Sequence, residues 1–128
     1  MTKVRRIAVD VMGGDHGPHV TVSAALKALR RHPDLHLVLV GPQQEITPSL
    51  DSLPPALRAR ASVLHTDDVI SNHDRPDRIL RSSRNSSMFI AIDQVKQGQA
   101  DACVSAGNTG ALLMAGRHLL KTIPGIDK

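Results

Sequence analysis

The sequence has 128 residues and a formal net charge of +4, and 41% of its residues are hydrophobic. This length suits one domain with a single core, and the composition is typical of a globular protein. The positive charge favours an anionic partner such as phosphate or an acidic protein. Nucleic acid is not expected, because Phe89 is the sole aromatic residue and single-strand binders need aromatic stacking platforms.

The N-terminus and the apolar runs predict a soluble, cytoplasmic protein. Residues 1–6 lead directly into a short strand, which leaves no room for the apolar core of a signal peptide. No apolar run approaches the roughly 20 residues of a membrane-spanning helix. Cys103 is the single cysteine and lies in an apolar run, so we expect a reduced compartment and a packing role for its side chain.

Apolar runs and breakers predict a βαβ unit at the start of the chain, with parallel strands. In chain order we expect a strand over residues 6–12, a loop over 13–19, a helix over 20–31 and a strand over 35–40. Val22, Leu26 and Leu29 share one face of the helix and should pack on the sheet. Asp10 is unusual, because a carboxylate inside a buried strand must be paired, hydrogen-bonded or close to the exposed end of the strand.

The rest of the chain continues the α/β pattern. Three prolines limit residues 43–61 to short helical pieces, of which 56–61 is favoured. There follow a strand over 62–66, a polar surface connection over 67–83, a helix over 88–97 with Ser86 and Ser87 as N-cap, a strand over 102–105 and a helix over 109–121.

Together these elements predict an open, mainly parallel three-layer α/β sheet. In the last helix Leu112, Leu113, Gly116, Leu119 and Leu120 are expected to face the sheet. The sequence stops after this helix with no closing strand, so residues 1–128 are expected to form a single α/β domain that is the N-terminal part of a larger one.

Two glycine-containing loops are expected at the carboxyl edge of the sheet, where open parallel sheets bind ligands. They are GGDHG at residues 13–17 and SAGNTG at residues 105–110. Neither fits the dinucleotide pattern G-x-G-x-x-G, and the Walker pattern is absent. The second loop is either a tight turn with Thr109 as N-cap, or an anion site made from backbone amides at the start of a helix.

Acid–base and cationic candidates flank these loops. His16 lies beside Asp15, which could orient its ring for proton transfer, although a loop histidine that only bonds backbone explains the pattern as well. The histidines lack metal-site spacing, so no metal is expected. Arg78, Arg81 and Arg84 recur every three residues and form either a phosphate-binding or partner-binding edge, or a solvated surface.

Four stretches of the chain resemble the PlsX-type phosphate acyltransferases of bacterial phospholipid synthesis. They are IAVDVMGGDHGP at residues 7–18, RSSRNSSM at 81–88, ADACVSAGNTGA at 100–111 and IPGID at 123–127. They occur in the family's order and are spread over the whole chain. At residues 71–76, SNHDRP departs from the family's pattern, which leaves the role of that turn open.

The resemblance implies transfer of a fatty acyl group from acyl-carrier protein to inorganic phosphate, giving acyl phosphate for a downstream membrane acyltransferase. It also implies a homodimer, a fold similar to the isocitrate and isopropylmalate dehydrogenases, no cofactor, and peripheral association with the inner face of the membrane. The alternative is a non-catalytic phosphate- or nucleotide-binding module, or an inactive fragment of the enzyme.

The resemblance also suggests roles for individual residues. His16, Asp15 and Asn108 are the catalytic candidates. The candidates for binding phosphate or substrate are Gly13, Gly14, Ser105, Gly107, Thr109, Gly110, Arg81, Ser86 and Ser87. Asp10 is expected to hold the turn at Gly13 and Gly14 rather than to touch substrate.

Overall fold

The computed structural model of the chain describes residues 3–71, 74–75 and 83–126. In this part of the chain, four parallel strands form one sheet in the order β3-β2-β1-β4. The strands are β1 (Arg5–Asp10), β2 (Leu35–Gly41), β3 (Ala61–His65) and β4 (Ala102–Val104). The open, parallel α/β architecture expected from the sequence is confirmed.

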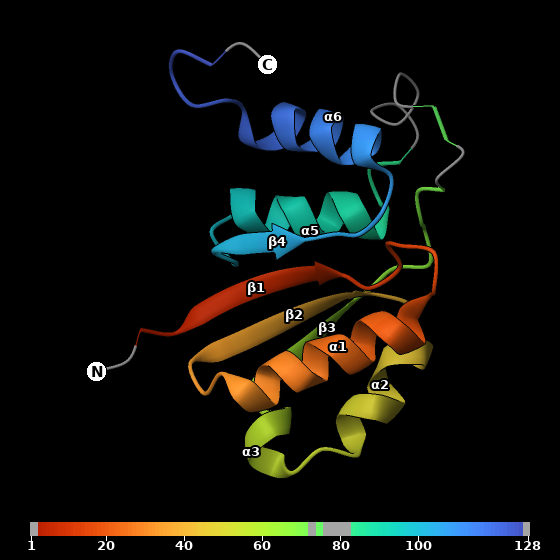
Figure 1. Cartoon of the computed structure of the whole chain (residues 1–128), viewed down its shortest axis with the longest axis vertical. Helices are drawn as coiled ribbons and strands as arrows, with labels where there is room; N and C mark the ends of the chain where they lie inside the picture. Colours follow the sequence, from red (N-terminus) through yellow and green to blue (C-terminus); the bar gives the residue numbers. More distant parts are fainter. Residues whose placement is uncertain (1–2, 72–73, 76–82, 127–128) are drawn as a thin grey trace.

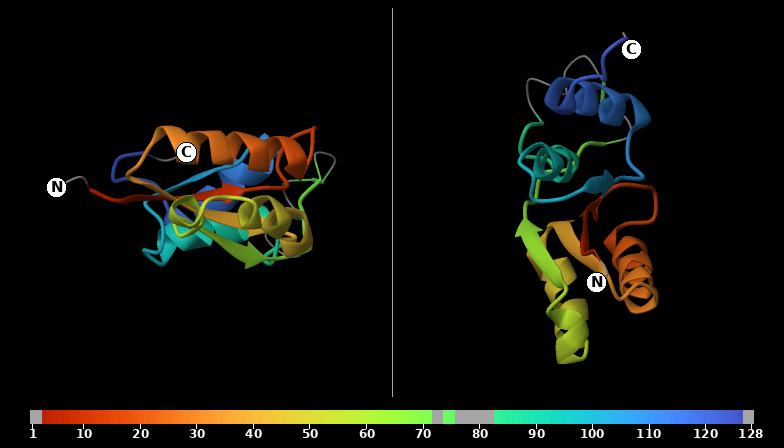
Figure 2. Two further views of the ribbon diagram at one scale, coloured as in Figure 1. Left: turned by 90° about the horizontal axis from the view of Figure 1, so that it is seen from below. Right: turned by 90° about the vertical axis from the view of Figure 1, so that its left-hand side faces the viewer.

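Helices lie on both faces of this sheet (Figure 1). The first face carries α1 (Pro18–Arg31), α2 (Gln43–Asp51) and α3 (Pro55–Arg58), and the opposite face carries α5 (Ser87–Lys96), with α6 (Thr109–Leu120) packed against it. Figure 2, in its right-hand view, shows α1 and α5 on opposite sides of the strands.

Aliphatic side chains form the core between the sheet and α1, as the sequence predicts. Val22, Leu26 and Leu29 of α1 are buried and belong to one cluster with Leu37 and Leu39 of β2. Because side chains alternate along a strand, Leu37 and Leu39 share the face that meets α1. Full burial of a leucine contributes about 1.5–3 kcal/mol, so this cluster holds the first layer together.

The opposite face of the sheet meets α5 through short side chains. Ala8 of β1 and Ala91 of α5 are both buried and form a cluster with Val40 of β2. Their size lets the helix lie close to the strands. Asp10 follows Ala8 by two residues, so the same alternation turns its carboxylate toward the N-terminus of α5.

The region between β2 and β3 is more helical than the sequence predicts. Helix α2 continues through Pro48, and α3 covers residues 55–58 in place of the expected 56–61. A proline removes one backbone hydrogen bond, but Ile46 and Leu50 of α2 are fully buried against the core and hold the helix in place.

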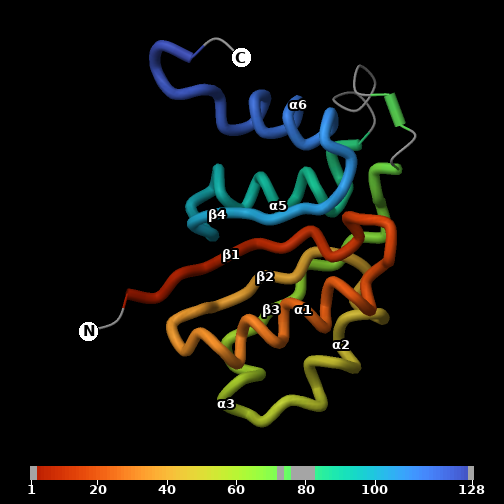
Figure 3. Tube along the Cα trace, viewed as in Figure 1, coloured from red at the N-terminus to blue at the C-terminus, as the bar shows by residue number. Residues whose placement is uncertain are grey.

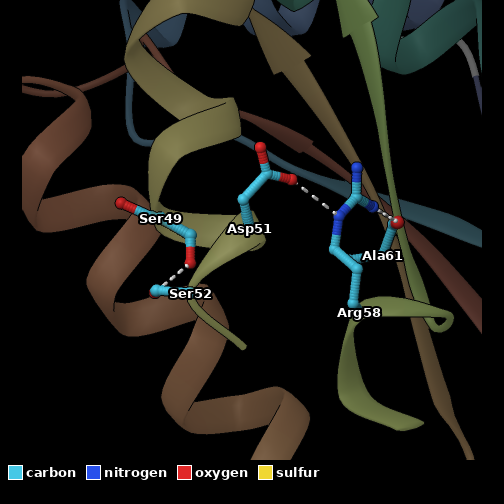
Figure 4. Close-up of polar contacts among 5 residues, drawn as sticks. All are labelled: Ser49, Asp51, Ser52, Arg58 and Ala61. Atoms are coloured by element: carbon cyan, nitrogen blue, oxygen red, sulfur yellow. Dashed lines mark hydrogen bonds and ion pairs between the residues drawn. The ribbon is translucent and has the colours of Figure 1, made fainter. Parts of the chain in front are cut away.

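Polar contacts fix the ends of these two helices (Figure 4). Arg58 Nη1 donates to the carbonyl oxygen of Ala61 at 2.8 Å, and Arg58 Nε lies 3.4 Å from Asp51 Oδ1. Ser52 Oγ donates to the carbonyl oxygen of Ser49 at 2.7 Å at the end of α2. Arg58 therefore connects the last residue of α2 to the first residue of β3.

Helix α6 does not face the sheet, contrary to the expectation from its leucines. It packs on α5 through Ala111 and Ala115, which are fully buried, while Leu113 is 65% exposed. The cause is the position of β4 at the edge of the described sheet, where α5 already covers the strand. Helix α6 therefore lies against the flank of α5, where Ala111 and Ala115 are buried and Leu112 and Leu119 pack beside them as partly buried residues.

Strand β4 is short and covered on one side only. Cys103 packs toward α5 and α6, whereas the adjacent Val104 is 56% exposed. Alternation turns Val104 to the face of α1, but α1 covers β1 and β2 rather than β4. None of the helices in the described part of the chain combines the length and apolarity needed to cross a membrane.

Candidate functional site

The loops that follow β1 and β4 lie against each other at the carboxyl edge of the sheet. The two strands pair in parallel, with Val9 opposite Val104, so they end side by side. A Cβ atom built on Gly13 would come within 2.8 Å of the backbone nitrogen of Gly107. Figure 3 shows both loops at the right-hand end of the sheet. The expectation that they share this edge is confirmed, and they touch directly.

A buried carboxylate lies beneath the two loops. Asp10 is 3% exposed, and its Oδ2 accepts a hydrogen bond of 2.7 Å from Ser105 Oγ. Its Oδ1 accepts one of 2.5 Å from Ser87 Oγ and one of 3.2 Å from the backbone N–H of Met12. Asp10 thus connects the end of β1, the start of α5 and the loop after β4.

Ser105 links Asp10 to the backbone of the loop after β4. Its Oγ donates to Asp10 and accepts a hydrogen bond of 3.1 Å from the backbone N–H of Gly107. The hydroxyl group and the Gly107 amide are therefore both engaged within the chain. Asp10 also receives the backbone N–H of Met12, one residue before the Gly13–Gly14 turn, as expected for a residue that holds this turn.

The two serines at the start of α5 are buried. Ser86 is the N-cap, as the sequence predicts, and its Oγ accepts a hydrogen bond of 3.2 Å from the backbone N–H of Phe89. Ser87 is fully buried and donates to Asp10. Both candidate binding residues therefore lie below the loop surface and bond to their own chain.

The N-cap residue of α6 is Asn108, so the interpretation of Thr109 as the N-cap is wrong. Asn108 Oδ1 accepts a hydrogen bond of 3.1 Å from the backbone N–H of Ala111. Its Nδ2 donates to the carbonyl oxygens of Ser71 and Asp74, both at 3.1 Å. Asparagine suits the N-cap position because its side-chain oxygen caps the helix while its side-chain nitrogen bonds to the neighbouring loop.

The first turn of α6 presents backbone amides at the edge of the sheet. Thr109 and Gly110 are its first two helical residues, and amides at these positions have no acceptor inside the helix. Thr109 is exposed and Gly110 is half-buried. Amides at a helix N-terminus can bind an anion, whereas the Gly107 amide already donates to Ser105 Oγ.

The loop after β1 exposes its acid–base candidates. Asp15 and His16 are both exposed, and Gly17 is the N-cap residue of α1. Gly14 and Gly17 have φ angles of 97° and 82°, a region that L side chains rarely adopt. The glycines therefore shape the turn that carries Asp15 and His16 into solvent.

The arginine candidates fall mostly outside the described residues. Arg78 and Arg81 lie there, so the expectation of a cationic edge stays a prediction. Arg84 is exposed and lines a shallow groove with Phe89 and His118 between α5 and α6.

Cys103 has the packing role expected of it. Burial and, to a smaller extent, the negative charge of Asp10 raise the pKa of its thiol. A raised pKa lowers the fraction of thiolate, so this position opposes use of the sulfur as a nucleophile. Among residues 3–71, 74–75 and 83–126 there is no group of three histidine, cysteine or acidic side chains that could hold a metal ion.

Sequence reasoning missed the hydrogen bonds that join these loops. It marked Asp10 as a buried carboxylate in need of partners but did not identify Ser87 and Ser105 as those partners. The pairing of β1 with β4 is what identifies Ser105 as a partner of Asp10. Val9 pairs with Val104, so the next residues along the two parallel strands are Asp10 and Ser105.

The comparison with known proteins identifies the family. The profile described as fatty acid synthesis protein matches residues 5–128. The chain belongs to this family. It is 53% identical over 122 residues to the phosphate acyltransferase of Shewanella amazonensis and 55% identical over 122 residues to that of Shewanella putrefaciens. These matches cover 95% of the chain but only 36% of each relative.

Proposed function

We propose that this member of the fatty acid synthesis protein family provides the N-terminal portion of a phosphate acyltransferase, which moves a fatty acyl group from acyl-carrier protein to inorganic phosphate. One structural observation carries the proposal: the two glycine loops touch at the carboxyl edge of the sheet, directly beside the first turn of α6. The name of the relatives, phosphate acyltransferase, supplies the reaction class.

The reaction needs a place for a dianion next to a thioester. A phosphate oxygen attacks the thioester carbonyl carbon, the carbon–sulfur bond breaks, and the products are acyl phosphate and the carrier thiol. A thiolate leaves readily, so the protein has to position phosphate and to stabilise the developing oxyanion. Backbone amides at a helix N-terminus suit both tasks.

The residues divide between these tasks. The amides of Thr109 and Gly110 would hold phosphate, and His16 with Asp15 would manage its proton or donate to it. Gly13 and Gly14 would allow close approach of the substrate to the backbone. Asn108 would set the direction of the first turn of α6 through its cap and would reach substrate only after releasing Ser71 and Asp74.

The partners follow from the same chemistry. The net charge of +4 suits an acidic carrier protein and an anionic substrate, and Arg84 is an exposed cation on the α5 side of the molecule. We further propose a cytoplasmic homodimer that associates peripherally with the membrane and uses neither a cofactor nor a metal.

The test is acyl transfer by the complete gene product. Acyl-carrier protein loaded with a fatty acyl group is incubated with and without inorganic phosphate, and acyl phosphate is captured with hydroxylamine. We expect the hydroxamate to form only when phosphate and enzyme are both present. Release of free fatty acid at a rate independent of phosphate would contradict the proposal.

The alternative is a non-catalytic phosphate-binding module. One observation favours it for the 128-residue chain: the matches cover 36% of each relative. Titration of this chain with phosphate and with acyl-carrier protein separates the two functions. An acyltransferase must bind both, whereas a simple phosphate-binding module binds only phosphate.

A further inference from the structure

We propose that Asp10 is a positioning residue that acts through Ser105 to fix the loop after β4 and, with it, the direction of the amides at the start of α6. This inference rests on the proposed function, because it assigns a role in phosphate binding to a residue that phosphate does not touch. Asp10 is 3% exposed, so its carboxylate meets only groups of its own chain.

The first step of the argument is the direction of the hydrogen bonds. An ionised carboxylate only accepts, so the hydroxyl groups of Ser87 and Ser105 must both point their protons at Asp10. Hydrogen bonds to a charged acceptor are about twice as strong as neutral ones, and burial strengthens them further. The carboxylate therefore fixes the orientation of the Ser105 hydroxyl.

The second step is the effect on the loop. With its proton directed at Asp10, Ser105 Oγ presents a lone pair to the backbone N–H of Gly107, which donates at 3.1 Å. This hydrogen bond turns the Gly107 amide inward. The Gly107 peptide is thereby held two residues before Thr109, where α6 begins, so its position sets where the first turn of the helix starts.

The third step is the coupling of the two loops. The same carboxylate accepts from the backbone N–H of Met12, and Gly13 lies against the Gly107 amide. One buried group therefore holds both sides of the candidate phosphate site. In this arrangement Ser105 transmits the position of Asp10, and the phosphate ligands are the amides of Thr109 and Gly110 at the start of α6.

Steady-state kinetics of the complete gene product test the proposal. We expect Asp10→Asn to raise the KM for phosphate about tenfold, the loss expected for a hydrogen bond to a charged group. The KM for the acyl donor should change less than about twofold, because the proposed network contacts only the phosphate side of the site. Ser105→Ala should give a similar split.

The double variant tests whether Asp10 affects phosphate binding through Ser105. If Asp10 acts through Ser105, Asp10→Asn combined with Ser105→Ala should raise the KM for phosphate no more than the more severe single variant. Multiplicative effects of the two substitutions would overturn the proposal. An unchanged KM for phosphate in Asp10→Asn would overturn it as well.

Arg60→Lys is the control for destabilisation. The guanidinium group of Arg60 donates to the carbonyl oxygens of Leu29, His32 and Leu35 at the amino end of β2, away from the two loops at the carboxyl edge. Its substitution should lower the melting temperature without raising the KM for phosphate. An increase in KM equal to that of Asp10→Asn would show that loss of stability alone explains the effect, and would overturn the proposal.

Amide hydrogen exchange separates this proposal from the proposed function. In Asp10→Asn the Gly107 amide should exchange at least about tenfold faster than in the wild type, while the Leu39 amide in β2 keeps its protection. If the wild type transfers no acyl group, the proposed function fails, and the exchange rate of Gly107 still tests the network. Unchanged protection of Gly107 would overturn the positioning role whatever the activity.

Discussion

Gly13 and Gly107 meet backbone to backbone at the carboxyl edge of the sheet. A Cβ atom on Gly13 would lie 2.8 Å from the Gly107 nitrogen, 2.9 Å from Ser105 Oγ and 3.0 Å from Asp10 Oδ2. All three atoms belong to the hydrogen-bonded network under the loops. Glycine at position 13 is therefore required by close approach, and the two loops can touch only because this residue has no side chain.

Replacement of Gly13 tests this contact. Gly13→Ala should lower the free energy of unfolding by about 1–3 kcal/mol, because the added methyl group must displace the backbone of Gly107 or break the hydrogen bond between Ser105 and Asp10. Urea unfolding followed by circular dichroism measures the effect.

Gly116→Ala is the matched control for Gly13→Ala. A Cβ atom on Gly116 meets nothing within 4 Å, and the residue lies inside α6. Alanine is the better helix former, so this variant should gain up to about 1 kcal/mol. Equal effects of the two alanine substitutions would contradict the close contact at Gly13.

Arg60, the residue directly before β3, bonds to backbone carbonyls at the C-terminal end of α1 and the start of β2. Its Nη1 donates to the carbonyl oxygens of His32 and Leu35 at 3.0 and 2.9 Å, and its Nη2 donates to that of Leu29 at 2.9 Å. Arg60→Lys should cost about 1–3 kcal/mol, because an ammonium group lacks the planar fork that reaches three carbonyls.

Arg31→Lys is the control for the Arg60 prediction. Arg31 is an exposed residue in the last turn of α1, and lysine keeps the charge that favours this helix end. Its melting temperature should stay within about 1 °C of the wild type. A melting temperature of Arg60→Lys that is equally unchanged would show that the three hydrogen bonds contribute nothing.

The layers of this fold are predictable from local patterns, whereas the contacts between loops are not. Val22, Leu26 and Leu29 recur at helical spacing, and their burial on the sheet follows from that pattern alone. The partners of Asp10 depend on which strands are neighbours. Ser105 is 95 residues away from Asp10, and the order β3-β2-β1-β4 brings them together.

Helix α6 shows why a hydrophobic pattern does not identify its partner. Its leucines predict an apolar face, but Ala111 and Ala115 are buried and Leu113 is largely exposed. Ala111 and Ala115 let the axes of α5 and α6 approach closely, and Leu112 and Leu119 pack beside them as partly buried residues. The leucine pattern predicts an apolar face, and the position of α5 decides which of its residues are buried.

The thiol of Cys103 gives a prediction about pH. Burial first, and the charge of Asp10 second, raise its pKa, so the folded protein holds this proton at pH values where the unfolded chain has lost it. The folded state then binds more protons, and stability should fall as pH rises through the range in which an ordinary thiol ionises. Urea unfolding of the wild type and of Cys103→Ser over that range measures the difference.

Alkylation by iodoacetamide checks the same pKa by a second route. At neutral pH, Cys103 in the folded protein should react more slowly than the same cysteine in urea, because less thiolate is present and the group is half-buried. Asp10→Asn removes the charge and should move the midpoint of the pH–rate profile to lower pH. A midpoint that does not move would refute the contribution of Asp10.

Asn108 combines a helix cap with a loop tether, and substitution can separate the two. Asn108→Ala loses both and should cost about 1–3 kcal/mol, whereas Asn108→Ser keeps an oxygen for the Ala111 amide and loses only the bonds to Ser71 and Asp74. Asn108→Ser should therefore lie between Asn108→Ala and the wild type in urea unfolding. Its Ser71 amide should exchange faster with solvent, while the Ala111 amide keeps its protection. Loss of protection at both amides in Asn108→Ser would mean that the cap and the tether are one cooperative unit rather than two separable contacts.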